Sequence, residues 1–248
     1  MIFGRLIVNI AIILAGGVGS RVGSNTPKQF INILNKPILA YTIEKFQRHD
    51  EIDFVQVVCV KSHIERLKEI VDTYNFLKVK WIVEGGATFQ ESVINGIDNL
   101  STVCNESDLV SIHFGASPFV SSDIISDSLK VCAEKGNAIS TTPFYLLSGI
   151  KADREKSLEY IDRDTIACMN SPHTFQYGFI KRLYDEARST KIIDKIDHPH
   201  TTSLMYAMGY PIYFSKGSQT NIKITTAEDL ELFEGYVLMQ RGKEYCEK

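Results

Sequence analysis

Apolar and polar positions follow two rhythms along this chain. Continuous apolar runs, typical of strands buried on both faces of a sheet, alternate with segments whose apolar residues recur every three to four positions, as in amphipathic helices. The predicted strands are Ile7 to Leu14, Asp53 to Val60, Val79 to Glu84 and Leu109 to His113, and the predicted helices are Ile38 to Gln47, Ser62 to Tyr74 and Phe89 to Leu100. This order predicts an α/β fold with a largely parallel sheet, helices on both faces and ligands at the carboxyl ends of the strands.

The alternation stops after about residue 138. The stretch from Ile139 to Phe175 has short strand-like segments, many charges and many turn formers, so we expect it to leave the sheet as an arm. A helix from Gly178 to Arg188, a strand from Tyr210 to Ser215 and a helix from Ala227 to Glu244 then return to the α/β pattern. We expect a single domain over residues 1–248 with an excursion at about 139–175.

Composition and charge exclude several classes of function. With 248 residues, 44% of them hydrophobic, the chain can bury a substantial core. A net charge of -3 provides no basic field, so nucleic acid is not an expected partner. No stretch approaches the ~18 apolar residues of a membrane span, and we expect no membrane partner. The five cysteines lie far apart without a CxxC pair, which favours the reducing cytoplasm over a disulfide framework or a zinc site.

The N-terminal apolar stretch has two interpretations. Arg5 followed by Leu6 to Ala15 resembles a signal peptide in its order of charge and hydrophobicity. However, the stretch continues directly into a glycine-rich loop and has no clear small-x-small cleavage site. A buried first strand is the favoured interpretation.

The loop after this first strand has the composition of a phosphate-binding site. Glycines allow backbone N–H groups to approach an anion, and Arg21 and Lys28 supply cationic donors, whereas glycines alone would indicate only a mobile turn. The Walker pattern is absent, and the dinucleotide pattern GxGxxG fails because Val22 occupies the position of its third glycine. The loop reads Ala15-Gly16-Gly17-Val18-Gly19-Ser20-Arg21-Val22-Gly23, and Pro27-Lys28-Gln29 follows.

This loop reproduces the signature A-G-G-x-G-x-R-x-G-x-x-x-P-K-Q and resembles the cytidylyltransferases that activate methylerythritol phosphate or ribitol phosphate. Gly85-Gly86 with Gln90 to Gly96 is similar to a second family segment, and Asn221 to Thr226 with Glu228 to Leu230 is similar to a third. The resemblance covers nearly the whole chain. It implies a Rossmann-like three-layer nucleotidyltransferase fold with a mostly parallel mixed sheet and a projecting β-arm.

The resemblance also implies roles for individual residues. Cations that offset phosphate charge would be Arg21, Lys28 and Lys223. Considered alone, Ser92 could equally be a helix-facing hydroxyl and Lys223 a solvated strand residue. The expected nucleotide-binding residues are Ala15, Gly16, Gly17, Gly19, Gly85 and Ser92.

The chain departs from the family at the expected metal site. The family motif D-A-A-R-P-F, whose aspartate helps to hold magnesium, aligns with Phe114 to Phe119, so that Phe114 replaces the aspartate and Ser117 the arginine. Phenylalanine cannot coordinate Mg²⁺, which requires hard oxygen ligands. Mg²⁺ remains expected from the resemblance, but its ligand is unknown. His113 is a poor magnesium ligand and is more simply a histidine at the end of a strand.

The acceptor side has also changed. Arg163 is retained and is the expected residue for the acceptor phosphate. Ser148-Gly149 stands where the family has Asp-Thr, Asn170 to His173 replaces Q-T-P-Q, and Pro199 to Ser203 replaces a segment with an aspartate. In the family this half of the site lies partly on an arm shared across a dimer, so the resemblance implies a homodimer formed through the arm.

These patterns lead to a functional hypothesis. We expect a cytidylyltransferase that moves CMP from CTP to a small alditol phosphate, such as ribitol 5-phosphate, and releases pyrophosphate. The first alternative is a cytosine-nucleotide-binding homologue with impaired or lost catalysis. A methylerythritol phosphate cytidylyltransferase is disfavoured by the altered acceptor residues, and a nicotinamide-dependent dehydrogenase by the failed GxGxxG pattern.

Overall fold

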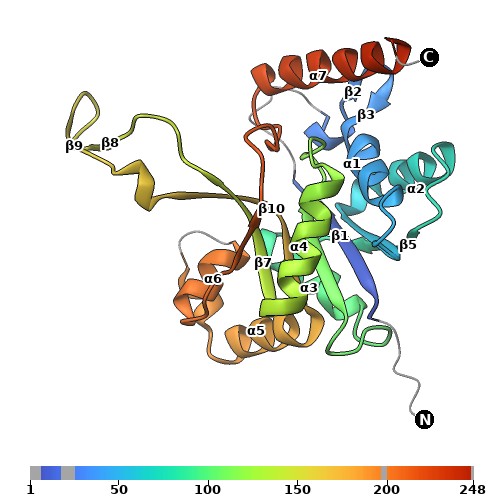
Figure 1. The fold of residues 1–248 in the computed structure, drawn as a ribbon. Coiled ribbons are helices and arrows are strands. Elements are labelled where there is room, and N and C mark those ends of the chain that lie inside the picture. Colours follow the sequence, from blue (N-terminus) through green and yellow to red (C-terminus); the bar gives the residue numbers. More distant parts are fainter. Residues whose placement is uncertain (1–6, 18–25, 197–199, 247–248) are drawn as a thin grey trace.

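A seven-stranded mixed sheet forms the centre of the computed structural model, which describes residues 7–17, 26–196 and 200–246 (Figure 1). Its strand order is β11-β7-β10-β6-β1-β4-β5. β10 runs antiparallel to both of its neighbours, and the other neighbouring pairs are parallel, which confirms the expected mostly parallel mixed sheet. The strands are β1 (Asn9–Ala15), β4 (Phe54–Cys59), β5 (Val79–Glu84), β6 (Leu109–Phe114), β7 (Asn137–Pro143), β10 (Ala167–Gln176) and β11 (Phe214–Lys216).

Helices cover both faces of this sheet. Alternate side chains of β1 belong to different hydrophobic clusters: Ala11 and Ile13 pack with α1, α2 and α4, whereas Ile10 and Ile12 pack with α3, α5 and α6. This burial on both faces explains the uninterrupted apolar sequence of β1, and it confirms the three-layer α/β architecture. The helices are α1 (Ile38–Gln47), α2 (Ile64–Thr73), α3 (Phe89–Asn99), α4 (Ser122–Lys135), α5 (Tyr177–Ser189), α6 (Thr201–Ala207) and α7 (Ala227–Cys246).

A third, smaller hydrophobic cluster packs the C-terminal helix against residues from the first half of the chain. Phe233 and Val237 of α7 pack with Ile33, Ile38 and Phe119. Ile33 belongs to the short antiparallel pair of β2 (Asn32–Ile33) and β3 (Lys36–Pro37), which precedes α1. None of the helices within the described residues is long and apolar enough to cross a membrane.

The observed helices and strands differ from the predicted ones in several places. α4 and α6 were not predicted, because their buried faces carry polar residues such as Ser128 and Thr201 that weaken the apolar pattern. The strand predicted from Tyr210 to Ser215 is β11, which begins only at Phe214, where pairing with Ile139 of β7 starts.

The arm is shorter than the sequence predicts. β7 and β10 pair with each other from Ala167↔Pro143 to Phe175↔Asn137, so both ends of the expected excursion at 139–175 belong to the central sheet. These strands could not be recognised from the sequence because their buried side carries polar residues. Thr174 Oγ1 lies 2.7 Å from Ser128 Oγ and donates to Ser111 Oγ at 3.1 Å. The segment that leaves the sheet is therefore 144–166.

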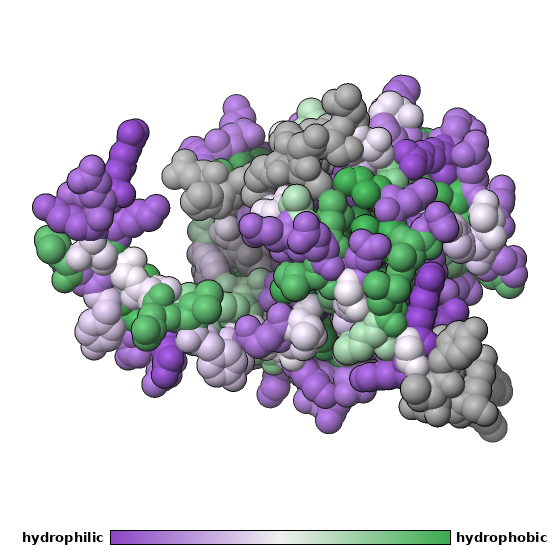
Figure 2. All heavy atoms as spheres, turned by 90° about the horizontal axis from the view of Figure 1, so that it is seen from above, coloured by the Kyte–Doolittle hydropathy of each residue, from purple (hydrophilic) through white to green (hydrophobic). Residues whose placement is uncertain are grey.

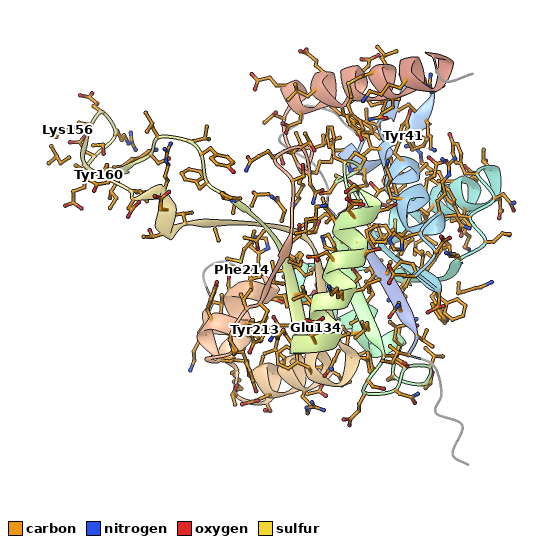
Figure 3. All side chains as sticks on the ribbon, viewed as in Figure 1. Tyr41, Glu134, Lys156, Tyr160, Tyr213 and Phe214 are labelled. Carbon is orange, nitrogen blue, oxygen red and sulfur yellow. The ribbon has the colours of Figure 1, made fainter. Side chains whose placement is uncertain are left out.

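The arm extends away from the sheet and ends in a hairpin of β8 (Gly149–Lys151) and β9 (Ser157–Tyr160) (Figure 1). Apolar side chains on it are exposed, with Leu147 at 92%, Leu158 at 77% and Tyr160 at 83% of full exposure. Figure 2 shows apolar atoms along the projecting arm, and Figure 3 places Lys156 and Tyr160 at its far end. The arm therefore presents apolar surface that no other part of the described chain covers.

Gly96 on α3 provides a test of how closely this helix packs on the sheet. A Cβ at Gly96 would lie 3.1 Å from Val58 Cγ2 and 3.2 Å from Ile12 Cγ2, whereas a Cβ at Gly235 on α7 meets nothing within 4 Å. We expect Gly96→Ala to lower the free energy of unfolding by about 1–3 kcal/mol through overpacking. Gly235→Ala should raise it by up to about 1 kcal/mol through helix propensity. Urea denaturation measures both, and a Gly96→Ala protein as stable as Gly235→Ala would contradict the close contact.

Candidate active site

Loops from several strands meet at the carboxyl edge of the sheet. Gly16 and Gly17 follow β1, Gly85 follows β5 and Gly115 follows β6. Backbone hydrogen bonds continue the sheet into these loops: Gly85 N donates to Cys59 O at 2.8 Å, and Gly115 N donates to Leu14 O at 2.8 Å. Parallel strands thus bring distant parts of the sequence to one edge, where the fold class predicts ligand binding.

The first pocket at this edge is lined by three of the predicted nucleotide-binding residues, Gly16, Gly17 and Ser92. It has a volume of about 260 Å³. Ser92 Oγ accepts a hydrogen bond from Gly86 N at 3.1 Å and donates to Thr88 O at 3.0 Å. A Cβ would approach this oxygen to 3.2 Å from Gly16 and 3.1 Å from Gly85, so a side chain at either position would require Ser92 to shift by a few tenths of an ångström. The lining residues are Gly16, Gly17, Gly86, Ala87, Thr88, Phe89 and Ser92.

The N-terminus of α3 forms one wall of this pocket. Thr88 and Glu91 make a capping box, in which Glu91 N donates to Thr88 Oγ1 at 3.1 Å and Glu91 Oε2 accepts from the N–H of Thr88. The cap fixes the start of the helix, whose remaining N–H groups and dipole favour negative charge. The wall therefore suits an anionic ligand.

Gln29 holds the glycine loop at its base. Its Nε2 donates to Ala15 O and to Gly17 O, both at 2.8 Å, and the residue is only 2% exposed. The side chain thereby holds the carbonyl groups of Ala15 and Gly17, on either side of Gly16. The sequence pattern contains Gln29 as part of the signature but assigns it no role, and only its place after Lys28 could have indicated one.

Lys28 connects the glycine loop with the C-terminal motif. Its Nζ donates to Ile224 O at 2.5 Å, and Ile224 N donates to Ala116 O at 2.8 Å. Asp229 fixes the end of this motif, because its Oδ2 accepts from Thr225 N at 2.7 Å and Thr226 N at 2.9 Å at the start of α7. The predicted cations Lys28 and Lys223 therefore belong to one hydrogen-bonded assembly at the sheet edge.

A second pocket of about 200 Å³ contains Lys223 and Phe114. The Lys223 ammonium lies 3.9 Å from the centroid of the Phe114 ring, a cation–π contact. Phe89, which lines the first pocket, lies 6.0 Å from Phe114 and 5.2 Å from His200 between ring centroids, so the two pockets are neighbours. The lining residues are Phe114, Ser117, Met169, Asn170, Ser171, His173, His200, Thr202 and Lys223.

Two buried histidines lie beside this second pocket. Burial lowers the pKa of His173 to about 3, and the nearby charges of His113, His200 and Lys223 act in the same direction. Burial also lowers the pKa of His113 to about 4, while its Nε2 donates to Ser117 O at 2.8 Å. Both imidazoles are therefore neutral near pH 7. His113 lines neither pocket and contacts Phe46 at 5.0 Å on the other face of the sheet, which supports the interpretation as a strand-end histidine.

The donors at the expected metal position do not fit a protein-held magnesium ion. Neither pocket is lined by an aspartate or a glutamate, and the described residues contain no group of three or more His, Cys, Asp or Glu side chains that could hold a metal. At the aspartate position of the motif, the Phe114 ring faces the Lys223 ammonium, and neither group can ligate a hard cation.

Among the described residues, the predicted site residues Ala15, Lys28, Gly85 and Arg163 line neither pocket. Gly19 and Arg21 lie outside the described residues. Arg163 lies on the arm in the turn Arg163–Thr165, where its Nη1 donates to Tyr145 O at 3.3 Å, and it lines neither pocket. In contrast, Asn170, Ser171 and His173, which occupy the place of Q-T-P-Q, do line the second pocket.

The sequence also missed two aromatic residues. Phe89 and His200 link the two pockets, but one lies at the start of a predicted helix and the other in a segment without periodicity. Aromatic residues at such positions more often belong to a core, so the pattern contained no signal for this role.

Comparison with known proteins agrees with this geometry. The family model described as 2-C-methyl-D-erythritol 4-phosphate cytidylyltransferase, IspD, matches residues 9–239. The chain belongs to this family. Within the family, the chain is 40% identical over 227 residues to the ribitol-5-phosphate cytidylyltransferase of Lacticaseibacillus paracasei, covering 92% of this chain and 97% of the relative. It is 38% identical to the 2-C-methyl-D-erythritol 4-phosphate cytidylyltransferase of Clostridium tetani, covering 94% and 92%.

Solved structures of the IspD family share the fold. The 4-diphosphocytidyl-2C-methyl-D-erythritol synthase of Anaerococcus prevotii superposes with a TM-score of 0.76 at 22% identity, over 94% of this chain and 99% of the other. The Francisella tularensis 2-C-methyl-D-erythritol 4-phosphate cytidylyltransferase gives 0.72 at 26% identity, over 91% and 97%. The expected nucleotidyltransferase fold is thus confirmed.

Proposed function

We propose that this protein transfers a cytidylyl group from CTP to an alditol phosphate such as ribitol 5-phosphate and releases pyrophosphate. The observation that carries the proposal is the junction of two pockets at the sheet edge, one built by glycines and Ser92, the other containing Lys223. Phe89 contacts both pockets, so two substrates bound there would lie next to each other. The relative from Lacticaseibacillus paracasei, named for ribitol 5-phosphate, supports the choice of acceptor.

The proposed reaction is a direct displacement at phosphorus. An oxygen of the acceptor phosphate attacks the α-phosphorus of CTP, a new P–O bond forms, and the bond from the α-phosphorus to the bridging oxygen breaks in line as pyrophosphate leaves. Such a reaction depends on positioning and electrostatics. Lys28 and Lys223 lie at the sheet edge where they would offset the developing charge, together with Arg21 from the glycine loop.

Nucleotide recognition would come from the first pocket. The backbone groups of the loop from Ala15 through Gly19, held by Gln29, would face the phosphates. Gly85 and Ser92, which meet at the base of the pocket, would contact the nucleoside.

The lining of the second pocket suits an acceptor whose non-phosphate part is an uncharged polyol. Ser117, Asn170, Ser171 and Thr202 supply hydroxyl and amide groups along its wall, all of which can donate to or accept from sugar-alcohol hydroxyls. The acceptor phosphate requires a further cation, for which we propose Arg163. Because Arg163 lies on the arm and outside both pockets, it would have to come from the arm of a second copy of the chain.

A second candidate function follows from Phe114. A homologue that binds cytosine nucleotides without turnover would need the first pocket but no metal ligand at the sheet edge. The Phe114 ring under the Lys223 ammonium meets that description. We propose that any magnesium enters with CTP and is held by the phosphate oxygens, since no aspartate or glutamate of the described chain lines either pocket.

We also propose a cytoplasmic location and a homodimer. The cytoplasm supplies CTP, and widely spaced cysteines without a CxxC pair suit a reducing compartment. The exposed apolar residues of the arm support pairing with a second copy, because contiguous apolar surface of this kind commonly marks an interface.

The dimer is tested by polar substitution on the arm. Replacing Leu147, Leu158 and Tyr160 by serine should shift the protein from dimer to monomer in sedimentation at micromolar concentration. The control replaces Leu77 and Leu232, leucines outside the arm that are 66% and 61% exposed, and should leave the dimer intact. A wild-type protein that sediments as a monomer would contradict the proposal.

The activity is tested by pyrophosphate release from CTP with a panel of acceptors. We expect release with ribitol 5-phosphate to exceed that with methylerythritol phosphate. Lys28→Ala should weaken CTP binding about 10- to 150-fold, because a charge-assisted hydrogen bond contributes about 1.5–3 kcal/mol. Lys68→Ala, an exposed lysine on α2 paired with Glu65, is the control and should bind CTP as the wild type does. Unchanged affinity and turnover in a folded Lys28→Ala protein would refute the role of Lys28.

The role of position 114 is tested by Phe114→Asp with Phe114→Asn as a neutral control of matched size. Without magnesium, the new carboxylate should repel the triphosphate and weaken CTP binding. With magnesium, it could ligate the ion and restore affinity, so calorimetry should show a larger magnesium effect for Phe114→Asp than for Phe114→Asn. Turnover should rise only if the acceptor pocket is competent. Identical CTP binding with and without magnesium in a folded Phe114→Asp protein would show that position 114 does not adjoin the triphosphate.

A further inference from the structure

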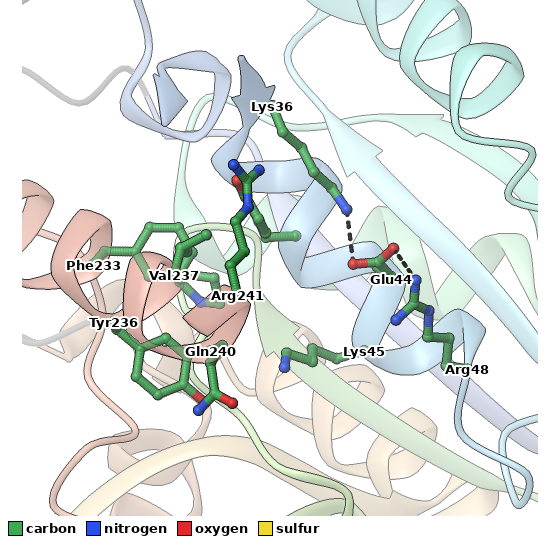
Figure 4. Close-up of a pocket in the computed structure, with 11 residues that line it drawn as sticks. Lys36, Glu44, Lys45, Arg48, Phe233, Tyr236, Val237, Gln240 and Arg241 are labelled. Carbon is green, nitrogen blue, oxygen red and sulfur yellow. Dashed lines mark hydrogen bonds and ion pairs between the residues drawn. The ribbon is translucent and has the colours of Figure 1, made fainter. Parts of the chain in front are cut away.

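A third pocket, of about 310 Å³, lies between α1 and α7 (Figure 4). None of its lining residues lines the nucleotide or acceptor pocket, so it is a separate site. α1 contributes cationic side chains to one wall, and α7 contributes Tyr236, Gln240 and Arg241 to the other. The functional proposal above makes no use of these residues.

The charges of this pocket are unbalanced. Its lining contains four cations, Lys36, Lys45, Arg48 and Arg241, and one carboxylate, Glu44. Glu44 is already bonded on both oxygens, with Lys36 Nζ and Arg48 Nη2 each at 2.7 Å. Within the described residues, Lys45 and Arg241 have no carboxylate within 4.0 Å. Four cations less one carboxylate leave a net charge of +3.

Lys45 points its ammonium into this unbalanced environment. Its side chain extends from α1 toward Gln240 and Tyr236 of α7 (Figure 4). Burial lowers the pKa of Lys45, and the charges of Arg48 and Lys36 lower it further against the opposing effect of Glu44. A half-buried ammonium close to other cations raises the free energy of the folded protein unless an anion binds next to it. An anion bound beside Lys45 would therefore stabilise the folded protein.

Tyr236 gives the pocket a second kind of surface. Its ring is held by Phe119 at 5.1 Å and Phe233 at 6.5 Å between centroids, so it is fixed beside the cations. An aromatic ring with a hydroxyl can pack against the organic part of a ligand and donate to its oxygens. The pocket thus combines an anion site with a wall for a small organic group.

We propose that this pocket binds the phosphate group of a small phosphorylated molecule. A phosphate monoester carries about -1.5 to -2 charges at pH 7 and three acceptor oxygens, which match the Lys45 ammonium and the Arg241 guanidinium. Arg241 has no carboxylate partner and hydrogen-bonds only the neutral Tyr41 hydroxyl among the interactions of the described residues. Inorganic pyrophosphate presents the same chemistry without an organic group. The inference does not rest on the proposed reaction, because it uses none of the residues assigned to that reaction.

The test requires a signal that comes from this pocket alone, since the nucleotide pocket also attracts phosphates. Trp81 is the only tryptophan of the chain and lies on β5, so Trp81→Phe with Tyr236→Trp creates a fluorescent reporter in the α1–α7 pocket. Titration of this reporter with ribose 5-phosphate and with pyrophosphate distinguishes an organic phosphate from the inorganic ion. We expect a saturable change with at least one of the two.

Variants of the reporter protein then locate the binding site. Lys45→Met, which keeps the length of the side chain, and Arg241→Gln at an exposed position should each weaken binding about 10- to 150-fold. Lys130→Met on the exposed face of α4 is the matched control and should bind as the parent does. CTP binding at the sheet edge, measured by calorimetry in the otherwise wild-type protein, should be unchanged by Lys45→Met. A reporter that responds to neither probe, or equal affinities in all variants, would overturn the proposal.

Discussion

β1 is buried on both faces, and the rest of the molecule depends on this constraint. Its alternate side chains pack into two separate hydrophobic clusters, so neither the strand nor its register can shift without exposing apolar surface. The strand therefore delivers Gly16 and Gly17 to a fixed place at the sheet edge. β4, β5 and β6 run parallel to it and bring their own carboxyl ends to the same place. The candidate site is a consequence of how the core is layered.

The electrostatics of that edge differ from those expected of a magnesium-holding site. Positive charge comes from Lys28 and Lys223, whereas the position of the expected carboxylate carries the Phe114 ring. An aromatic face attracts an ammonium through its quadrupole but contributes no formal negative charge. The Phe114 ring thus leaves this position without a carboxylate that could anchor a divalent ion. The buried His173, neutral near pH 7, adds no competing charge beside it.

The sequence was sufficient for the layers of the fold, because these rest on local patterns, whereas the nucleotide-binding role of the glycine loop stays a prediction. The apolar run of β1, the helix from Ile38 to Gln47 and the strand from Val79 to Glu84 have unmistakable periodicity, and the glycine motif follows directly from β1. The predicted bounds of the arm were wrong because Ser111, Ser128 and Thr174 form a buried polar network. Polar residues of this kind in a sequence resemble an exposed segment. The aromatic link through Phe89 and the hydrogen bonds of Gln29 depend on tertiary contacts, which no local pattern contains.

The hydrogen bond from Lys28 to Ile224 joins residues 196 positions apart. It makes the two cationic motifs of the candidate site depend on segments that leave the ribosome nearly two hundred residues apart. A nascent chain that already carries the glycine loop and most of the sheet still lacks the carbonyl that holds Lys28 and the lysine that faces Phe114. Completion of the charged edge therefore waits until residues 223 and 224 have been synthesised, and a shorter nascent chain would present its first strand and glycine loop to the cell without that edge.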